Sequence, residues 1–500
     1  MRLYKTTAIL ITGLSLVGCN EALVRDFNTP TGYPHTIGSL QSEFTGIFSN
    51  MRVEEGRLDF TLEGFARSAA YYTPSEVRFV TMFTGSAKLD DDNFGALSWQ
   101  NEYTYAKDAD TLASILQTLT TSAGAKMPTA NLNALLGVVE TIKAMDYMYV
   151  ALTHDTNGVA MAAPGQPYSG TLAPILCARD SWKEIVAMLD SAKADLDAAG
   201  ASTKFGWPGT EFATMQVPPG FASVSANAGA YEAFTQALLA RARIEYAYAI
   251  ARGPGGNAPT VTSAGSPDQA QLDSAIADIT SSALYTPNLS VSEAIPANDA
   301  GVFFTYSAAA GDLQNQNFAQ SASVYALEGA AKQVDTLHDQ RWLAKWQVAP
   351  AQPTSTGAAA ASSWVFTANL TPSTPQTITR NLELNFLLAR AYLGTGQLLK
   401  AAQIVDAVRT TVGGLASGLP GVNTSDYVSV RDFLMKEMLP TLIKDGPGEQ
   451  LVAIRDLGLV MQDLTTWETL APFTDYHTSV ENIPSVEREQ RHNNFAPICP

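Results

Sequence analysis

The chain has 500 residues, a formal net charge of −17 at pH 7 and only 16% charged residues. This length exceeds the usual size of one compact core, so we expect two subdomains or an extended array. The acidic balance argues against nucleic acid and anionic lipid headgroups as partners, because both are negatively charged themselves.

The N-terminus has the layout of a secretory signal peptide. A short basic start with Arg2 and Lys5 precedes an apolar stretch that falls well short of the ~20 residues needed to span a membrane. The stretch ends in a pattern that resembles a bacterial lipobox, with Leu16 three positions before the cleavage site and Cys19 directly after it. We expect residues 1–18 to be removed and Cys19 to carry the lipid that anchors the chain. An ordinary signal peptide with a chance cysteine is the alternative.

The first half of the chain carries several segments with helical spacing of apolar residues. The clearest are residues 131–153 and 178–200, which we expect to form a pair. The second of these helices is expected to open at Asp180 or Ser181, because both side chains are good N-caps. Two further helices are expected over residues 37–49 and 111–120.

Two later segments repeat the same helix pair. The sequence LLARA at residues 238–242 recurs at residues 387–391, with helical spacing on both sides of each copy. Residues 379–413 also fit a tetratricopeptide repeat, with the small Ala389 and Ala401 where two helices approach closely. A generic amphipathic helix pair is the alternative. We expect at least three stacked pairs, because each pair needs a neighbour to bury its apolar face.

Three long stretches without helical spacing separate the pairs, at residues 205–227, 285–320 and 349–377. Loops of this length inside a compact domain are usually functional or disordered. Disordered linkers are normally poor in aromatic residues, whereas these stretches contain several. We therefore expect ordered insertions that pack on the helical scaffold and carry its binding surface.

The aromatic residues suggest where a ligand binds. Trp99, Asn101 and Tyr103 follow an acidic loop that contains glycine. Aromatic rings contact the C–H faces of sugars and apolar ligands, and amides fix hydroxyl groups. For each aromatic cluster the alternative is packing against the helical core. A second cluster of the same kind comprises Phe303, Phe304 and Tyr306.

Motifs for catalysis are absent from the sequence, which has no GxSxG elbow, Walker loop, HExxH or CxxC pair. Residues 90–93 and 154–158 resemble cation loops only faintly, because neither has the distal glutamate of an EF-hand. A turn rich in Asx side chains is the preferred interpretation of both. We expect no enzymatic activity, no cofactor and no metal. A glycosidase-type pair of carboxylates stays open, since its members need not be close in sequence.

Two cysteines follow Cys19, namely Cys177 and Cys499. In an oxidising compartment they could form one disulfide that ties the C-terminus to the start of a helix. Two unpaired thiols are the alternative.

The order of these features resembles the SusD/RagB family. The tyrosine-rich AMDYMYVALTHDTNG at residues 144–158 stands where that family has a helix followed by an Asp-containing loop. LLARAYLGTGQLLKAAQIVDAVRTTVGG at residues 387–414 is similar to its best-marked helix pair. GEQLVAIRDLGLV at residues 448–460 retains Arg455, Asp456 and Gly458 but lacks the second arginine of the family pattern. NIPSVEREQRHNN, residues 482–494, is similar to a pattern near the end of the family.

The resemblance implies a mostly α fold, in which residues 19–500 form a SusD-like domain of irregular tetratricopeptide-type pairs, a curved scaffold with long inserted loops. It also implies an outer-membrane lipoprotein that faces outward, binds a nutrient such as an oligosaccharide and covers a TonB-dependent SusC-like transporter. Residues 99–101 fall where ligand residues occur in relatives, and Arg78 could add a hydrogen-bonding fork. The alternatives are a tetratricopeptide scaffold lipoprotein of outer-membrane assembly and a lipid-anchored hydrolase.

Overall fold

The structure is a computed structural model. It describes residues 36–83, 87–91, 96, 98–120, 124–161, 172–211, 227–252, 267–309, 313–351, 353, 361–367, 370–419, 421–446, 448–457 and 480–491. The predicted lipid attachment at Cys19 and the predicted domain start lie outside the described residues, and so does Cys499.

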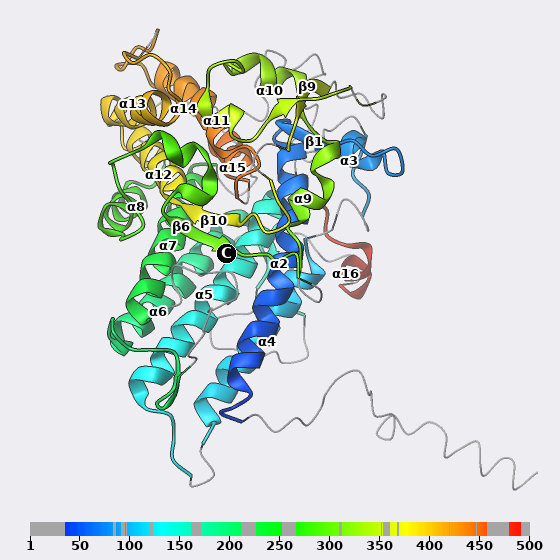
Figure 1. The fold of residues 1–500 in the computed structure, drawn as a ribbon. Coiled ribbons are helices and arrows are strands. Elements are labelled where there is room, and N and C mark those ends of the chain that lie inside the picture. The colour runs from blue at the N-terminus through cyan, green and yellow to red at the C-terminus, as the bar shows by residue number, and fades with distance from the viewer. Residues whose placement is uncertain are drawn as a thin grey trace, which may run out of the picture. The chain divides into compact units, whose positions relative to one another are not determined.

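The fold is mostly helical, as the sequence predicts, and Figure 1 shows its longer helices lying side by side. Short 3₁₀ turns and one π-helical turn, Val408–Val412, connect or extend these helices. The helices are α2 (Leu40–Phe65), α3 (Arg78–Thr81), α4 (Gln100–Thr118), α5 (Thr129–His154), α6 (Ala178–Ala199), α7 (Ala228–Arg252), α8 (Gln269–Ser281), α9 (Gln316–Gln320), α10 (Glu328–Gln333), α11 (Gln340–Leu343), α12 (Asn381–Gly394), α13 (Leu398–Ala407), α14 (Tyr427–Leu442), α15 (Glu449–Asp456) and α16 (Ser485–Gln490).

The three predicted helix pairs are confirmed as α5 with α6, α7 with α8, and α12 with α13. The predicted opening of α6 is wrong, because Cys177 occupies the N-cap and the helix begins at Ala178. Ser181 already lies inside the first turn, where its hydroxyl donates to the Cys177 carbonyl oxygen at 2.9 Å. Asp180 also lies inside this turn, where its carboxylate accepts from Arg179.

The close packing of α12 on α13 explains the small residues of the repeat pattern. Ala389 and Ala401 are fully buried where the two helices pack. Gly394 ends α12 against α8, and a Cβ atom at this position would lie 2.6 Å from Leu272 Cδ1. Gly396 has φ of +77°, a conformation that glycine adopts at little cost.

Short strands form the β-structure of the described residues. The largest sheet has four antiparallel strands in the order β1-β7-β9-β8, with Ala70 opposite Tyr325. A separate pair joins β6 to β10, with Val302 opposite Thr379. Several of these strands lie in stretches that the sequence showed as irregular, so the insertions are partly regular structure. The strands are β1 (Ala69–Tyr71), β2 (Val159–Ala160), β3 (Ile175–Leu176), β4 (Gly206–Trp207), β5 (Thr210–Glu211), β6 (Gly301–Phe304), β7 (Val324–Leu327), β8 (Gln347–Val348), β9 (Ala361–Val365) and β10 (Gln376–Arg380).

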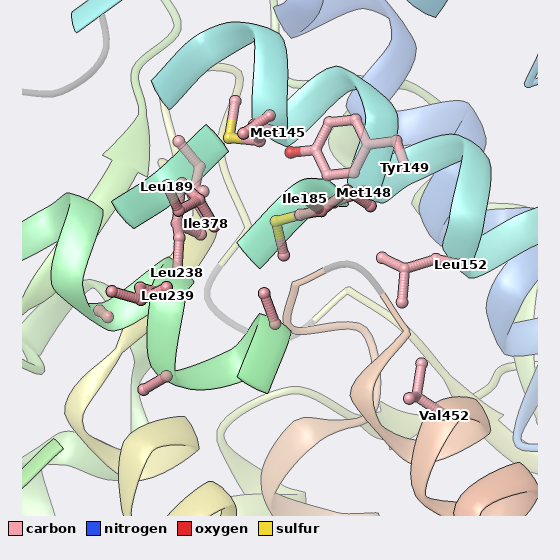
Figure 2. Packing of buried hydrophobic residues seen from close by; sticks show 14 of the residues in the cluster. Met145, Met148, Tyr149, Leu152, Ile185, Leu189, Leu238, Leu239, Ile378 and Val452 are labelled. Atoms are coloured by element: carbon pink, nitrogen blue, oxygen red, sulfur yellow. The ribbon is translucent and has the colours of Figure 1, made fainter. Parts of the chain in front are cut away.

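Helix α5 lies at the centre of the main core. Helices α2, α4, α6 and α7 all contact it, so almost every residue from position 134 to 154 is buried. A helix that is apolar all round requires such an enclosed position. Figure 2 shows its side chains facing those of α6, α7, β10 and α15; the labelled residues are Met145, Met148, Tyr149, Leu152, Ile185, Leu189, Leu238, Leu239, Ile378 and Val452.

A network of buried ion pairs joins α7, α12 and α15. Arg241 of α7 contacts Glu383 of α12 and Glu449 of α15. Arg390 of α12 contacts Glu449 and Asp456 of α15. Burial raises the pKa of Glu383 to about 7, although the positive charge of Arg241 acts in the opposite direction.

No helix within the described residues is both long enough and apolar enough to cross a membrane.

Candidate ligand-binding site

A cavity of about 460 Å³ opens where the start of α4, the strand after α5 and helix α16 meet. Its volume falls in the range of small-molecule sites, which is roughly 300–1,000 Å³. We call it the α4–α16 cavity. Its described lining consists of Ala96, Trp99, Gln100, Tyr103, Ala160, Leu172, Ala173, Pro484, Val486, Glu487, Gln490 and Arg491.

Two aromatic residues that the sequence singled out, Trp99 and Tyr103, line this cavity. Trp99 is the N-cap of α4 and Tyr103 lies one turn later, so their rings meet with centroids 4.9 Å apart. The Tyr103 hydroxyl accepts a hydrogen bond of 2.7 Å from the backbone N–H of Ala160. Trp99 is only 5% exposed, so it is a core residue that shows the cavity a small part of its surface.

The ring of His154 packs against Trp99, with ring centroids 4.9 Å apart. Burial lowers the pKa of His154 to about 3, so the imidazole is uncharged at neutral pH. Its Nδ1 atom lies 2.9 Å from the Thr153 hydroxyl. The ring that packs against Trp99 is therefore neutral at this pH.

Glu481 joins the chain segments that carry Trp99 and His154. Its carboxylate accepts a hydrogen bond of 2.9 Å from the backbone N–H of Ser98, next to Trp99. Its own N–H donates to the Thr153 carbonyl at 2.8 Å, and its carbonyl accepts from Asn157 Nδ2 at 2.6 Å. Sequence reasoning missed Glu481, because nothing in the local pattern shows that it reaches residues so far back in the chain.

Helix α16 supplies the polar side of the cavity, which sequence reasoning also missed. Arg491 Nε donates to Glu487 Oε1 at 2.7 Å, and its Nη2 lies 2.6 Å from the same oxygen. Gln490 of α16 and Gln100 of α4 are exposed at this side. The spacing of Glu487 and Arg491, four residues apart, was the available signal, since such pairs face each other on a helix.

Two other predicted residues contact protein groups elsewhere. Asn101 Nδ2 donates to Glu54 Oε1 at 2.7 Å, on the side of α4 that faces α2. Arg78 Nη2 lies 2.6 Å from Glu76 Oε2, and its Nη1 lies 3.5 Å from Asp90 Oδ2. The described lining of the α4–α16 cavity includes neither Asn101 nor Arg78.

The second aromatic cluster is built into the core. Phe304 is fully buried, and Tyr306 is 7% exposed and donates its hydroxyl to the Arg52 carbonyl oxygen. Phe303 is partly buried where β6 pairs with β10. Neither Phe304 nor Tyr306 has a ring face open to a ligand, so the alternative of core packing describes them better.

The loops that faintly resembled cation sites have other partners. Asp155 Oδ2 lies 2.7 Å from Arg252 Nη1, and Asp91 contacts Arg488. No group of three or more His, Cys, Asp or Glu side chains is arranged to hold a metal ion among the described residues. Asp155 and Asp91 are therefore ion-pair partners of arginines from distant parts of the chain.

Cys177 is disulfide-bonded in the structure. Because Cys499 lies outside the described residues, the pairing of these two cysteines stays a prediction.

Comparison with solved structures shows a shared fold at low sequence identity. A SusD superfamily protein from Bacteroides thetaiotaomicron matches with a TM-score of 0.63 and 13% identity, over 92% of this chain and 99% of that one. A surface glycan-binding protein A from Bacteroides uniformis matches with a TM-score of 0.60 and 13% identity, over 92% and 98% of the two chains. A SusD-like carbohydrate-binding protein from Bacteroides vulgatus matches with a TM-score of 0.62 and 12% identity, over 93% and 99%.

No family model matches the sequence, and neither does any curated protein. The structural matches show that the chain has the SusD-like fold.

Proposed function

We propose that this chain binds a carbohydrate nutrient in the α4–α16 cavity and has no catalytic activity of its own. The observation that carries the proposal is the cavity itself, about 460 Å³ in volume, with aromatic and amide side chains in its wall. Its fold is shared with proteins described as glycan-binding and carbohydrate-binding, which supports a ligand of that class.

The polar side of the cavity suits hydroxyl groups. The amides of Gln100 and Gln490 can each donate and accept a hydrogen bond, which is what a sugar hydroxyl requires. Glu487 and Arg491 neutralise each other, so they can hydrogen-bond a ligand without adding a net charge to the cavity.

A binding test has to avoid Trp99, because it is a buried residue as well as part of the cavity wall. Replacing a buried tryptophan with alanine costs about 3–5 kcal/mol of stability, so lost binding in that variant would be ambiguous. Gln100 and Gln490 are exposed, so we expect their replacement by alanine to leave the fold intact.

We therefore propose a glycan array followed by calorimetry with Gln100→Ala, Gln490→Ala and the matched control Gln347→Ala. Gln347 is exposed on β8 and is not part of the described cavity lining. The two cavity variants should each bind about fivefold more weakly, since one net hydrogen bond is worth about 1 kcal/mol. The control should bind as the parent chain does. A parent chain that binds no glycan on a broad array would contradict the proposal.

We propose further that a lipid on Cys19 anchors the protein to the outer membrane, facing the cell exterior. The lipobox-like sequence before Cys19 supports this. Cys19→Ala should move the protein into the soluble fraction, while its circular dichroism spectrum stays that of a folded chain. Retention of this variant in the membrane fraction would contradict the anchor.

The proposed partner is a TonB-dependent SusC-like transporter, to which the chain would deliver its ligand. The SusD-like fold supports this partner. Purification from membranes in mild detergent should recover such a transporter with the chain, and repeated recovery of the chain alone would contradict the partnership.

A further inference from the structure

The lining of the α4–α16 cavity contains aliphatic residues in addition to its polar ones. Leu172 is 45% exposed and Val486 is 62% exposed, and both line the cavity. Large apolar side chains are exposed at only a few positions in the described part of the chain. Burying such a side chain stabilises a complex by roughly 1.5–3 kcal/mol when the contact is complete. The other aliphatic residues of the described lining are Ala96, Ala160, Ala173 and Pro484.

The aromatic residues offer little surface for sugar stacking. The rings of His154 and Tyr103 both pack against Trp99, each with its centroid 4.9 Å from that of Trp99, and Trp99 is only 5% exposed. A plain sugar ring normally meets an open aromatic face through its C–H groups. The apolar contact that this cavity offers is instead aliphatic, from Leu172 and Val486, and it matches methyl and methylene groups of a ligand.

The charges of the cavity favour a neutral ligand. Glu487 and Arg491 are the charged residues of the described lining, and they contact each other at 2.6 Å. An acidic sugar would meet an arginine that is already paired and a carboxylate that repels it. Such a ligand would lose hydration without gaining a free cation in return.

From this combination we infer that the α4–α16 cavity binds a neutral oligosaccharide that carries apolar acyl groups, in preference to a plain or an acidic oligosaccharide. The hydroxyl groups face Gln100, Gln490 and the Glu487–Arg491 pair, while the acyl groups contact Leu172 and Val486. The inference rests on the proposed function, because it names the class of carbohydrate for the same cavity.

The test uses matched sugar probes with the full chain. These are O-acetylated xylo- and manno-oligosaccharides, the same mixtures after alkaline deacetylation, and oligogalacturonides as acidic probes. The acetylated probes should bind about tenfold more tightly than their deacetylated products, as expected for added methyl groups in an apolar site. Val486→Ser should reduce this difference, because the acetyl groups then lose one of their two exposed aliphatic contacts.

Val348→Ser is the matched control, because Val348 is 64% exposed on β8 and is not part of the described cavity lining. It should keep the preference for acetylated probes. The inference would be overturned if deacetylated or acidic probes bound as tightly as acetylated ones. If Gln490→Ala also weakened the binding of those probes, the proposed function would still stand. Binding to peptides with no sugar probe bound would overturn both.

Discussion

Arg241 offers the sharpest test of what holds the helices together. It is 1% exposed on α7, and its guanidinium lies 2.7 Å from Glu449 Oε1 on α15. It also contacts Glu383 on α12 and donates to the Ile378 carbonyl oxygen at 3.1 Å. Arg241→Ala would therefore leave two buried carboxylates and one backbone carbonyl without this partner.

The expected loss of stability is large because burial prevents water from replacing the guanidinium. Removing one partner of a buried ion pair typically costs about 3–5 kcal/mol. Arg243, two residues further along α7, is the matched control. Its side chain is 16% exposed and pairs with Asp190 and Asp278 near the surface. Surface pairs are worth about 0.2–1 kcal/mol each, so Arg243→Ala should cost at most about 2 kcal/mol.

Urea unfolding followed by circular dichroism measures both variants against the parent chain. The free energy of unfolding should fall by about 3–5 kcal/mol for Arg241→Ala and by clearly less for Arg243→Ala. Equal losses for the two variants, or a loss below about 1 kcal/mol for Arg241→Ala, would refute the reasoning that burial sets the energy of this network.

Three further predictions concern buried groups. Burial raises the pKa of Glu55 from 4.5 to about 8, so its contribution to stability is complete below pH 4.5 and is lost as the pH rises towards 8. Urea titrations across this range should show the decline in stability, and Glu55→Gln should flatten this pH dependence. Burial lowers the pKa of His154 from 6.5 to about 3, so its contribution to stability is complete above pH 6.5 and is lost as the pH falls towards 3. Thermal unfolding of His154→Gln should depend less on acid pH than that of the parent chain, and an unchanged pH dependence would contradict this prediction. Peptide mapping without reductant should find Cys177 bonded to Cys499, and a free Cys499 thiol would contradict this pairing.

The helices could be predicted from the sequence because their signal is local. In α5 and α7 the recurrence of apolar residues and the absence of internal proline suffice to indicate a helix of the observed extent. The start of α6 could not be read in the same way. Helix α6 begins at Ala178 without a capping side chain, and Ser181 stands inside its first turn, where it donates to the Cys177 carbonyl oxygen, so a residue type that favours caps need not be the cap.

The candidate site was only partly predictable, for reasons of distance along the chain. Trp99 and Tyr103 were found because they stand in one short aromatic pattern. The burial of Phe304 depends on β10, about seventy residues later, with which β6 pairs. Glu481 lies 383 residues from Ser98, and no local pattern carries information about a contact of that length.

The same long contacts have a consequence for the order in which the molecule is built. Residues 480–491 contact residues 91 and 98 through the Ser98–Glu481 hydrogen bond and the Asp91–Arg488 ion pair. These contacts join residues that are 383 and 397 positions apart. Helices α5 to α8 pack largely against their sequence neighbours and can form as soon as they are made. A chain that emerges with its N-terminus first therefore acquires its scaffold early and the α4–α16 cavity last. Until residue 491 has emerged, the lining of this cavity is incomplete.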